Sequence, residues 1–197
     1  MRRTLSLLAL VFTFLALSGV ATAAPMVFTT TLRGTNEVPP NASPGTGFAV
    51  VTVDPVAHTL IVNVSFSGLT GNTTASHIHC CAGLGVNAGV ATTTPTFTGF
   101  PSGVTAGTYS NIFDLTLTSS FNASFVTANG GTAAGAEAAF IAGMQAGLTY
   151  FNIHTNLFPG GEIRGQLQAV PEPATLLLLG IGLAGGAGKA FRRRRGR

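Results

Sequence analysis

The 197-residue sequence predicts an all-β protein, an antiparallel sandwich with one short helix, flanked by an N-terminal signal helix and a C-terminal hydrophobic helix. Two observations lead to this fold class. Between residues 24 and 170, short runs of strand-forming residues are separated by Gly, Pro and Asn clusters, which is typical of antiparallel sheets. Only one stretch has helical periodicity, so strands do not alternate with helices, which argues against a parallel α/β fold.

The expected strands are, in order, residues 26–33, 48–53, 59–66, 74–79, 92–97, 107–117, 148–155 and 161–168. The run 59–66 has the clearest pattern, because Leu60, Val62, Val64 and Phe66 alternate with Ile61, Asn63 and Ser65. A period of two predicts a strand with one buried face. Residue His58, in the turn before this strand, is expected to be solvated.

The single expected helix covers residues 133–146. Glu137, Phe140, Ile141 and Met144 share one helical face with Ala133 by i, i+3, i+4 spacing. Gly147 suits the position just beyond a helix end.

The net charge of +4 belongs to the two ends of the chain. Residues 2–3 are both Arg, and six of the last nine residues are Lys or Arg. Within residues 24–170, only Arg33 and Arg164 stand against five acidic residues, so the central region is net negative. This distribution excludes nucleic acid as a partner of the central region.

Residues 1–23 have the three parts of a secretory signal peptide. Two arginines precede the apolar run 5–17, and Ala21-Thr22-Ala23 is an A-x-A cleavage pattern, so we place the cut after Ala23. Thirteen apolar residues are too few for an uncleaved membrane anchor, which needs about 20.

The tail, residues 170–197, has three features in a characteristic order. Pro171-Glu172-Pro173 precedes an uncharged apolar and Gly-rich stretch, 174–188, which a basic cluster with Arg192, Arg193, Arg194 and Arg195 follows. This order resembles the PEP-CTERM sorting signal of Gram-negative bacteria. The resemblance implies transient anchoring in the inner membrane, cleavage by an exosortase near the Pro-Glu-Pro motif, and delivery to the cell surface or extracellular matrix, with exopolysaccharide or matrix as a candidate partner. The alternative is an ordinary C-terminal transmembrane anchor.

Three segments of the central region, residues 24–169, together resemble a CHRD domain. They are 32–40, which includes Asn36, Glu37, Pro39 and Pro40; 66–79, which ends in Ser-His-Ile-His; and 150–165, which includes Glu162 and Arg164. The resemblance covers roughly residues 27–168 and implies an immunoglobulin-like, Greek-key sandwich. It implies little about activity. We expect those six motif residues to have structural roles, with hydrogen bonds that pin strand ends.

Three histidines are candidate metal ligands. His77 and His79 lie two residues apart on one expected strand, so both rings point to the same face, and His154 lies on another strand. With Cys80 and Cys81 directly after His79, imidazole and thiolate donors are present for Cu or Zn. The alternative is that these histidines bridge loops by hydrogen bonds, for example to Glu162.

The adjacent cysteines cannot cross-link distant parts of the fold. Neighbouring Cα atoms are about 3.8 Å apart, below the usual disulfide range. Three roles stay open: a strained disulfide between neighbours, pairing with another molecule, and metal ligation with His77 and His79.

No motif indicates an enzyme. The sequence has no G-x-S-x-G elbow, and its few carboxylates do not pair at a telling spacing. The segment from Gly68 to His79 is faintly similar to the copper-ligand strand of Cu,Zn superoxide dismutase, but the further zinc ligands are not evident. We therefore expect an exported surface or matrix module without catalytic activity, with a Cu- or Zn-binding protein as the second hypothesis and a copper oxidoreductase as a distant third.

Overall fold

The computed structural model describes residues 24–171. Its elements are β1 (Met26–Arg33), β2 (Thr46–Asp54), β3 (Thr59–Ser67), β4 (Thr73–Cys80), β5 (Gly107–Asp114), α2 (Ala123–Ala128), α3 (Ala133–Gln145), β6 (Thr149–Thr155), β7 (Ile163–Gln166) and β8 (Gln168–Ala169). Several predictions fall outside the described residues. They are the two expected terminal helices and the roles of Ala21, Ala23, Glu172, Pro173 and the arginines 192–195. Among residues 24–171, no helix has the length and apolar character that crossing a membrane requires.

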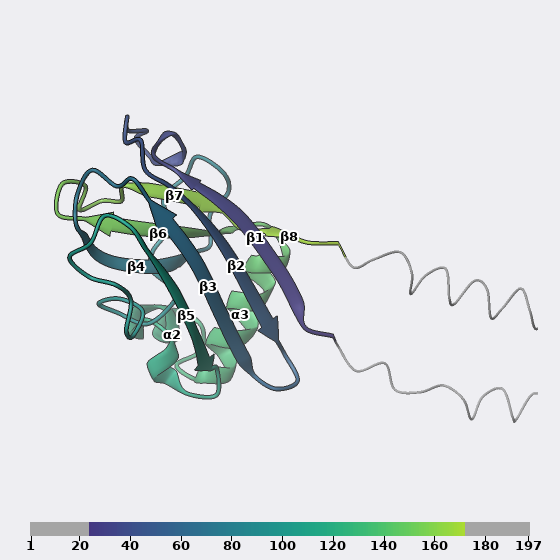
Figure 1. Ribbon diagram of the computed structural model, residues 1–197. Helices are drawn as coiled ribbons and strands as arrows, with labels where there is room; N and C mark the ends of the chain where they lie inside the picture. The colour runs from purple at the N-terminus through teal and green to yellow at the C-terminus, as the bar shows by residue number, and fades with distance from the viewer. Residues whose placement is uncertain (1–23, 172–197) are drawn as a thin grey trace, which may run out of the picture.

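The strands form one antiparallel sheet in the order β4-β6-β7-β1-β2-β3-β5, and β8 also pairs with β1. The predicted all-β antiparallel class is confirmed. Figure 1 shows that β1, β2, β3 and β5 form a front layer and that β4, β6 and β7 cross behind it. Strand β1 pairs with β2 at one edge and with β7 and β8 at the other. The two layers are therefore parts of a single curled sheet, joined at β1.

The core fills the space between these layers. In β3, Leu60, Val62, Val64 and Phe66 are all buried, as their alternation predicts. Phe97, from the β4–β5 connection, bridges the layers, since its ring centroid lies 5.2 Å from that of Phe113 in β5 and 5.9 Å from that of Phe151 in β6.

The expected strand at residues 92–97 is wrong. This segment is irregular apart from one isolated bridge between Thr92 and Phe121. Its hydroxyl groups replace a regular ladder along β4, because Thr92 Oγ1 accepts from the Ile78 N–H at 3.0 Å and Thr96 Oγ1 accepts from the Ser76 N–H at 2.9 Å. Pro95, which has no N–H, also cannot take part in a full ladder.

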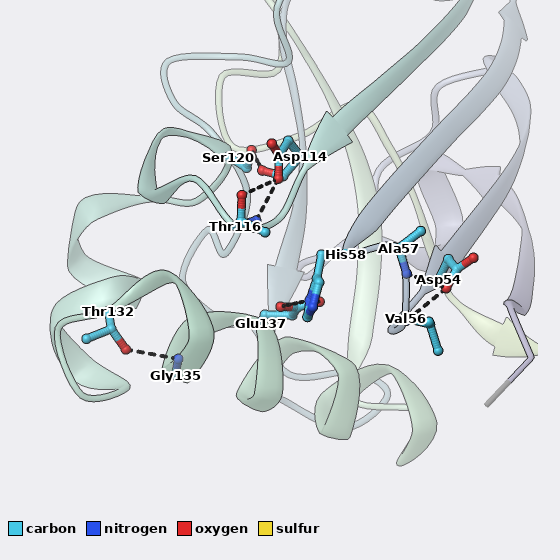
Figure 2. Close-up of polar contacts among 10 residues, drawn as sticks. All are labelled: Asp54, Val56, Ala57, His58, Asp114, Thr116, Ser120, Thr132, Gly135 and Glu137. Carbon is cyan, nitrogen blue, oxygen red and sulfur yellow. Dashed lines mark hydrogen bonds and ion pairs between the residues drawn. The ribbon is translucent and has the colours of Figure 1, made fainter. Parts of the chain in front are cut away.

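Strand ends differ from expectation where side chains take over backbone hydrogen bonds. Strand β5 stops at Asp114 rather than at residue 117, because the Asp114 carboxylate accepts from the Thr116 N–H at 2.9 Å (Figure 2). The missed helix α2 begins after Asn122, whose side chain accepts from the Ser124 N–H at 2.9 Å. Both are turn and cap interactions that compete with strand pairing.

Helix α3 matches the expected helix to within one residue and begins with a Thr132 side chain that accepts from the Gly135 N–H at 3.1 Å (Figure 2). Glu137, Phe140 and Met144 are buried, as expected, but Ile141 is only half-buried. The small residues Ala136 and Gly143 are buried in its place, which allows the helix to approach the sheet closely.

His58 connects the β2–β3 turn to α3. Its Nδ1 atom lies 2.9 Å from Glu137 Oε2 (Figure 2). The side chain is 49% exposed, so the expected solvation holds for about half of its surface. The same turn is fixed by Asp54, whose carboxylate accepts from the N–H groups of Val56 and Ala57 at 2.8 and 2.9 Å.

Candidate metal centre

The three candidate histidines meet on the outer face of the back layer. On β4, His77 and His79 alternate with the buried core residues Ile78 and Cys80, so both imidazoles point away from the core. On the neighbouring β6, His154 pairs in register with Ala75. One nitrogen atom from each of the three rings lies within 4.8 Å of the others. The strand register therefore brings together the residues that the i, i+2 spacing and the third strand predict.

Each imidazole uses one nitrogen atom to bind a backbone carbonyl. His77 Nε2 lies 2.7 Å from Pro95 O, His79 Nδ1 lies 2.9 Å from Ala88 O, and His154 Nδ1 lies 2.9 Å from Pro159 O. A carbonyl oxygen only accepts, so each of these nitrogens carries the proton of a neutral ring. The other nitrogen of each ring then presents a lone pair.

These second nitrogens have no partner within the described part of the chain. His77 Nδ1, His79 Nε2 and His154 Nε2 are buried and accept no hydrogen bond. A buried polar atom without a partner costs free energy and needs an explanation. Three such atoms, on rings that each bring a nitrogen within 4.8 Å of the others, indicate a site for a bound species.

Burial keeps the three rings neutral. It lowers the pKa of His77 to about 4 and that of His79 to about 4, against the opposing effect of their hydrogen bonds to Pro95 and Ala88. Burial also lowers the pKa of His154. Since neutral imidazole is the form that binds metal ions, the lone pairs are available across the neutral range.

The side chains of His79, Tyr150 and Arg164 form a stack. The Tyr150 ring lies parallel to the His79 ring at 4.5 Å, and the Arg164 guanidinium lies 3.7 Å from the Tyr150 ring centroid on β6. Arg164 is 2% exposed and donates to Asn87 Oδ1 at 2.7 Å and to Val86 O at 2.9 Å. These bonds fix the loop that carries the Ala88 carbonyl.

The backbone of Ala88 contacts both Tyr150 of this stack and the candidate metal ligand His79. Its carbonyl oxygen accepts from Tyr150 Oη at 3.2 Å as well as from His79, and its N–H lies 3.1 Å from the same hydroxyl group. Arg164 and Tyr150 thus fix the orientation of the His79 ring. In metal sites, hydrogen bonds of this kind hold the ligand in the correct tautomer.

Glu37 occupies a second buried position on this face. It accepts from Asn152 Nδ2 at 2.8 Å, and burial raises its pKa to about 7, although Arg164 and Asn152 act in the opposite direction. Gly161 is required beside it, because a Cβ atom there would lie 2.7 Å from Glu37 Oε1. Asn152 Oδ1 is buried without a partner.

Glu162 binds loops rather than histidines. Its carboxylate accepts from Ser43, Thr155 and the N–H groups of Thr70 and Gly71. Burial alone would raise the pKa of Glu162, but these hydrogen bonds outweigh it and hold the pKa below its ordinary value.

The remaining motif residues flank these contacts. Asn36 Nδ2 donates to Arg164 O at 3.0 Å. Pro39 and Pro40 are exposed in the connection from β1 to β2. Pro171 is the last described residue and is exposed.

The two cysteines are joined to each other as a disulfide and are not in the histidine group. Cys80 faces the core side of β4, opposite His79, where it packs against Gly143 of α3. A Cβ atom at Gly143 would lie 2.5 Å from the Cys80 sulfur and 2.6 Å from the Cys81 sulfur. Of the three open roles, the structure thus contains the bond between neighbours.

Sequence reasoning missed Tyr150, Asn152 and Asn87. The first two could have been found, because Tyr150, Asn152 and His154 occupy alternate positions of one strand and must share a face. Asn87 had no such signal, since its position depends on how a loop folds back over the sheet.

Two family models match the chain. The CHRD domain matches residues 28–167, and the PEP-CTERM protein-sorting motif matches residues 169–195. No curated protein and no solved structure is significantly similar to it.

Proposed function

The chain belongs to the CHRD domain family and ends in a PEP-CTERM sorting motif, and from this premise we propose that it is an exported, non-catalytic protein that binds a Cu or Zn ion through His77, His79 and His154. The sorting motif marks a protein that is exported in Gram-negative bacteria from a membrane-anchored precursor and processed by an exosortase.

The three unpartnered histidine nitrogens are the observation that carries this proposal. Hydrogen bonds to Pro95, Ala88 and Pro159 account for one nitrogen of each ring and leave the other buried and unpaired. A metal ion would satisfy all three lone pairs at once. Because metal–nitrogen bonds are about 2.0–2.1 Å long, atoms within 4.8 Å of one another can reach one ion with shifts of less than about 1 Å each.

The proposal of a non-catalytic role is supported by the burial of the ligands. His77 is 6% exposed and His79 is 8% exposed, so the loops that cover them leave little surface for a substrate. The copper-loaded protein is expected to show no turnover in oxidase or superoxide-dismutation assays.

The test is the metal content of the full-length protein, exported in a host without exosortase and purified in detergent. After exposure to Cu or Zn and removal of free ions, we expect one ion per chain. The double variant His77→Asn/His79→Asn should lose it. The control is His58→Asn, which changes a histidine outside the group. Wild-type protein without stoichiometric metal would refute the proposal.

The mature protein's destination is the second part of the proposal. We place it at the cell surface or in the extracellular matrix, with exopolysaccharide as the candidate partner. An immunoblot with and without exosortase should show loss of the tail, and the released form should sediment with exopolysaccharide. A mass that does not depend on exosortase would contradict processing of the tail.

A further inference from the structure

The ligand set of the histidine group carries no charge. It consists of three imidazoles, each of which donates its proton to a carbonyl, and it includes no carboxylate or thiolate among the described residues. Imidazole is a ligand for both zinc and copper, so the donor type does not decide between them. The charge of the ion and the number of ligands it needs must decide between zinc and copper.

On the His79 side, the surroundings of the group add positive charge. Arg164 is buried behind the Tyr150 ring, on which His79 stacks. The cost of moving an ion into a buried site rises with the square of its charge, so a divalent ion costs about four times as much as a monovalent one. No ligand of the group offsets that cost.

The buried carboxyl groups of Glu162 and Glu37 do not offset the higher cost of burying a divalent ion. Glu162 already accepts four hydrogen bonds, one of them from Thr155, whose side chain alternates to the opposite face of β6 from His154. Glu37 binds Asn152 and is outside the ligand group. A divalent ion would therefore stay under-compensated.

The number of ligands also favours a monovalent ion. Zinc in proteins is four-coordinate, and with three protein ligands it needs a fourth from water or substrate. Cu(I), a d¹⁰ ion, is stable with three nitrogen donors in a trigonal arrangement. The cysteine sulfurs, bonded to each other on the far side of β4, are not free to provide a fourth ligand.

We propose that the ion held by His77, His79 and His154 is Cu(I) rather than Zn(II) or Cu(II). This inference rests on the proposed metal-binding function and identifies its metal.

The experiment compares the two metals on the full-length protein in detergent. Cu(I) affinity is measured without oxygen, in ascorbate, by competition with bicinchoninate. Zn(II) affinity, and Cu(II) affinity in air without ascorbate, are measured by competition with chelating dyes. We expect one Cu(I) per chain, bound at least about 100-fold more tightly than Zn(II). His154→Asn should abolish Cu(I) binding, whereas His58→Asn should keep it.

A variant with an added negative charge tests whether charge causes the preference for Cu(I). Asn152→Asp adds a carboxylate at the register partner of His77 and should reduce the preference for Cu(I) over Zn(II) by about 10-fold or more. The matched control is Asn63→Asp on the open side of β3. Circular dichroism shows whether each variant is folded. If Asn152→Asp is not folded, the ratio of Cu(I) to Zn(II) affinity in the wild-type protein tests the inference.

The outcomes are distinct. Zn(II) or Cu(II) binding as tight as that of Cu(I), through the same histidines, would overturn this inference and leave the metal-binding function intact. Binding of none of these ions would overturn both. An unchanged ratio in folded Asn152→Asp would overturn the argument from charge.

Discussion

The two outer faces of the curled sheet differ in what covers them. The outer face of β4, β6 and β7, which we call the covered face, lies under loops, and its polar side chains are mostly buried. The outer face of β1, β2, β3 and β5, the open face, has exposed residues such as the register row Thr31, Phe48, Ser65 and Thr108. Sequence alternation marks non-core positions on both faces. Only the loops decide which of these positions meet water and which must find partners.

Two arginines test this difference most directly. Arg33 and Arg164 are register partners on adjacent strands, yet Arg33 is exposed and Arg164 is 2% exposed. Arg164→Ala would leave Asn87 and Val86 without their donor and open a cavity, so we expect it to lower the free energy of unfolding by about 3 kcal/mol. Arg33→Ala should change it by less than about 0.5 kcal/mol. Urea unfolding measures both, and equal effects would contradict the division into two faces.

Glu162 extends the comparison to pH. Because its folded pKa is held low, the stability it contributes is complete above the unfolded pKa, near 4.5, and is lost as the pH falls through the folded value. Glu162→Gln should cost about 2 kcal/mol at pH 7 and should flatten the pH dependence below 4.5. Urea titrations at several pH values are the measurement. A variant that keeps the wild-type slope would show that other groups cause the acid sensitivity.

The contact between His58 and Glu137, an ion pair when His58 is protonated, should contribute less, since His58 is half exposed. His58 has a φ of 54°, a conformation that Asn adopts readily, so His58→Asn removes the pair without backbone strain. We expect a loss of less than about 1 kcal/mol, which shrinks further in 1 M salt. Thermal unfolding at low and high salt measures it, and a larger, salt-independent loss would argue for a packing role.

The smallest effect is expected on the open face. Ile112 is 63% exposed on β5, and Thr has a similar β-branched shape. Ile112→Thr should change the free energy of unfolding by less than about 0.5 kcal/mol. A loss of 2 kcal/mol or more in urea unfolding would mean that a partner covers this face.

The sequence allowed strands with a clear alternation to be predicted, because burial of one face leaves a period of two, as in β3. It did not allow the segment around Phe97 to be assigned, since hydroxyl groups of Thr92 and Thr96 replace strand pairing there. The sheet order depends on contacts between residues far apart in the chain, which a single sequence does not show.

The candidate site could likewise be predicted only in part. His77, His79 and His154 could be predicted from strand spacing and residue type. Their acceptors could not, because Pro95, Ala88 and Pro159 contribute backbone carbonyls that any residue carries. Nor does the sequence show which ring nitrogen is left free, since that depends on the path of each loop.

The position of β1 between the two layers has a consequence for the timing of folding. It is the first strand of the domain, and its second edge is completed by the last, with Thr29 paired to Gln168 and Phe28 to Ala169. Contacts of such sequence separation are slow to form. The sheet cannot close until nearly the whole domain has emerged, so a chain exported N-terminus first completes its fold only as its sorting tail arrives.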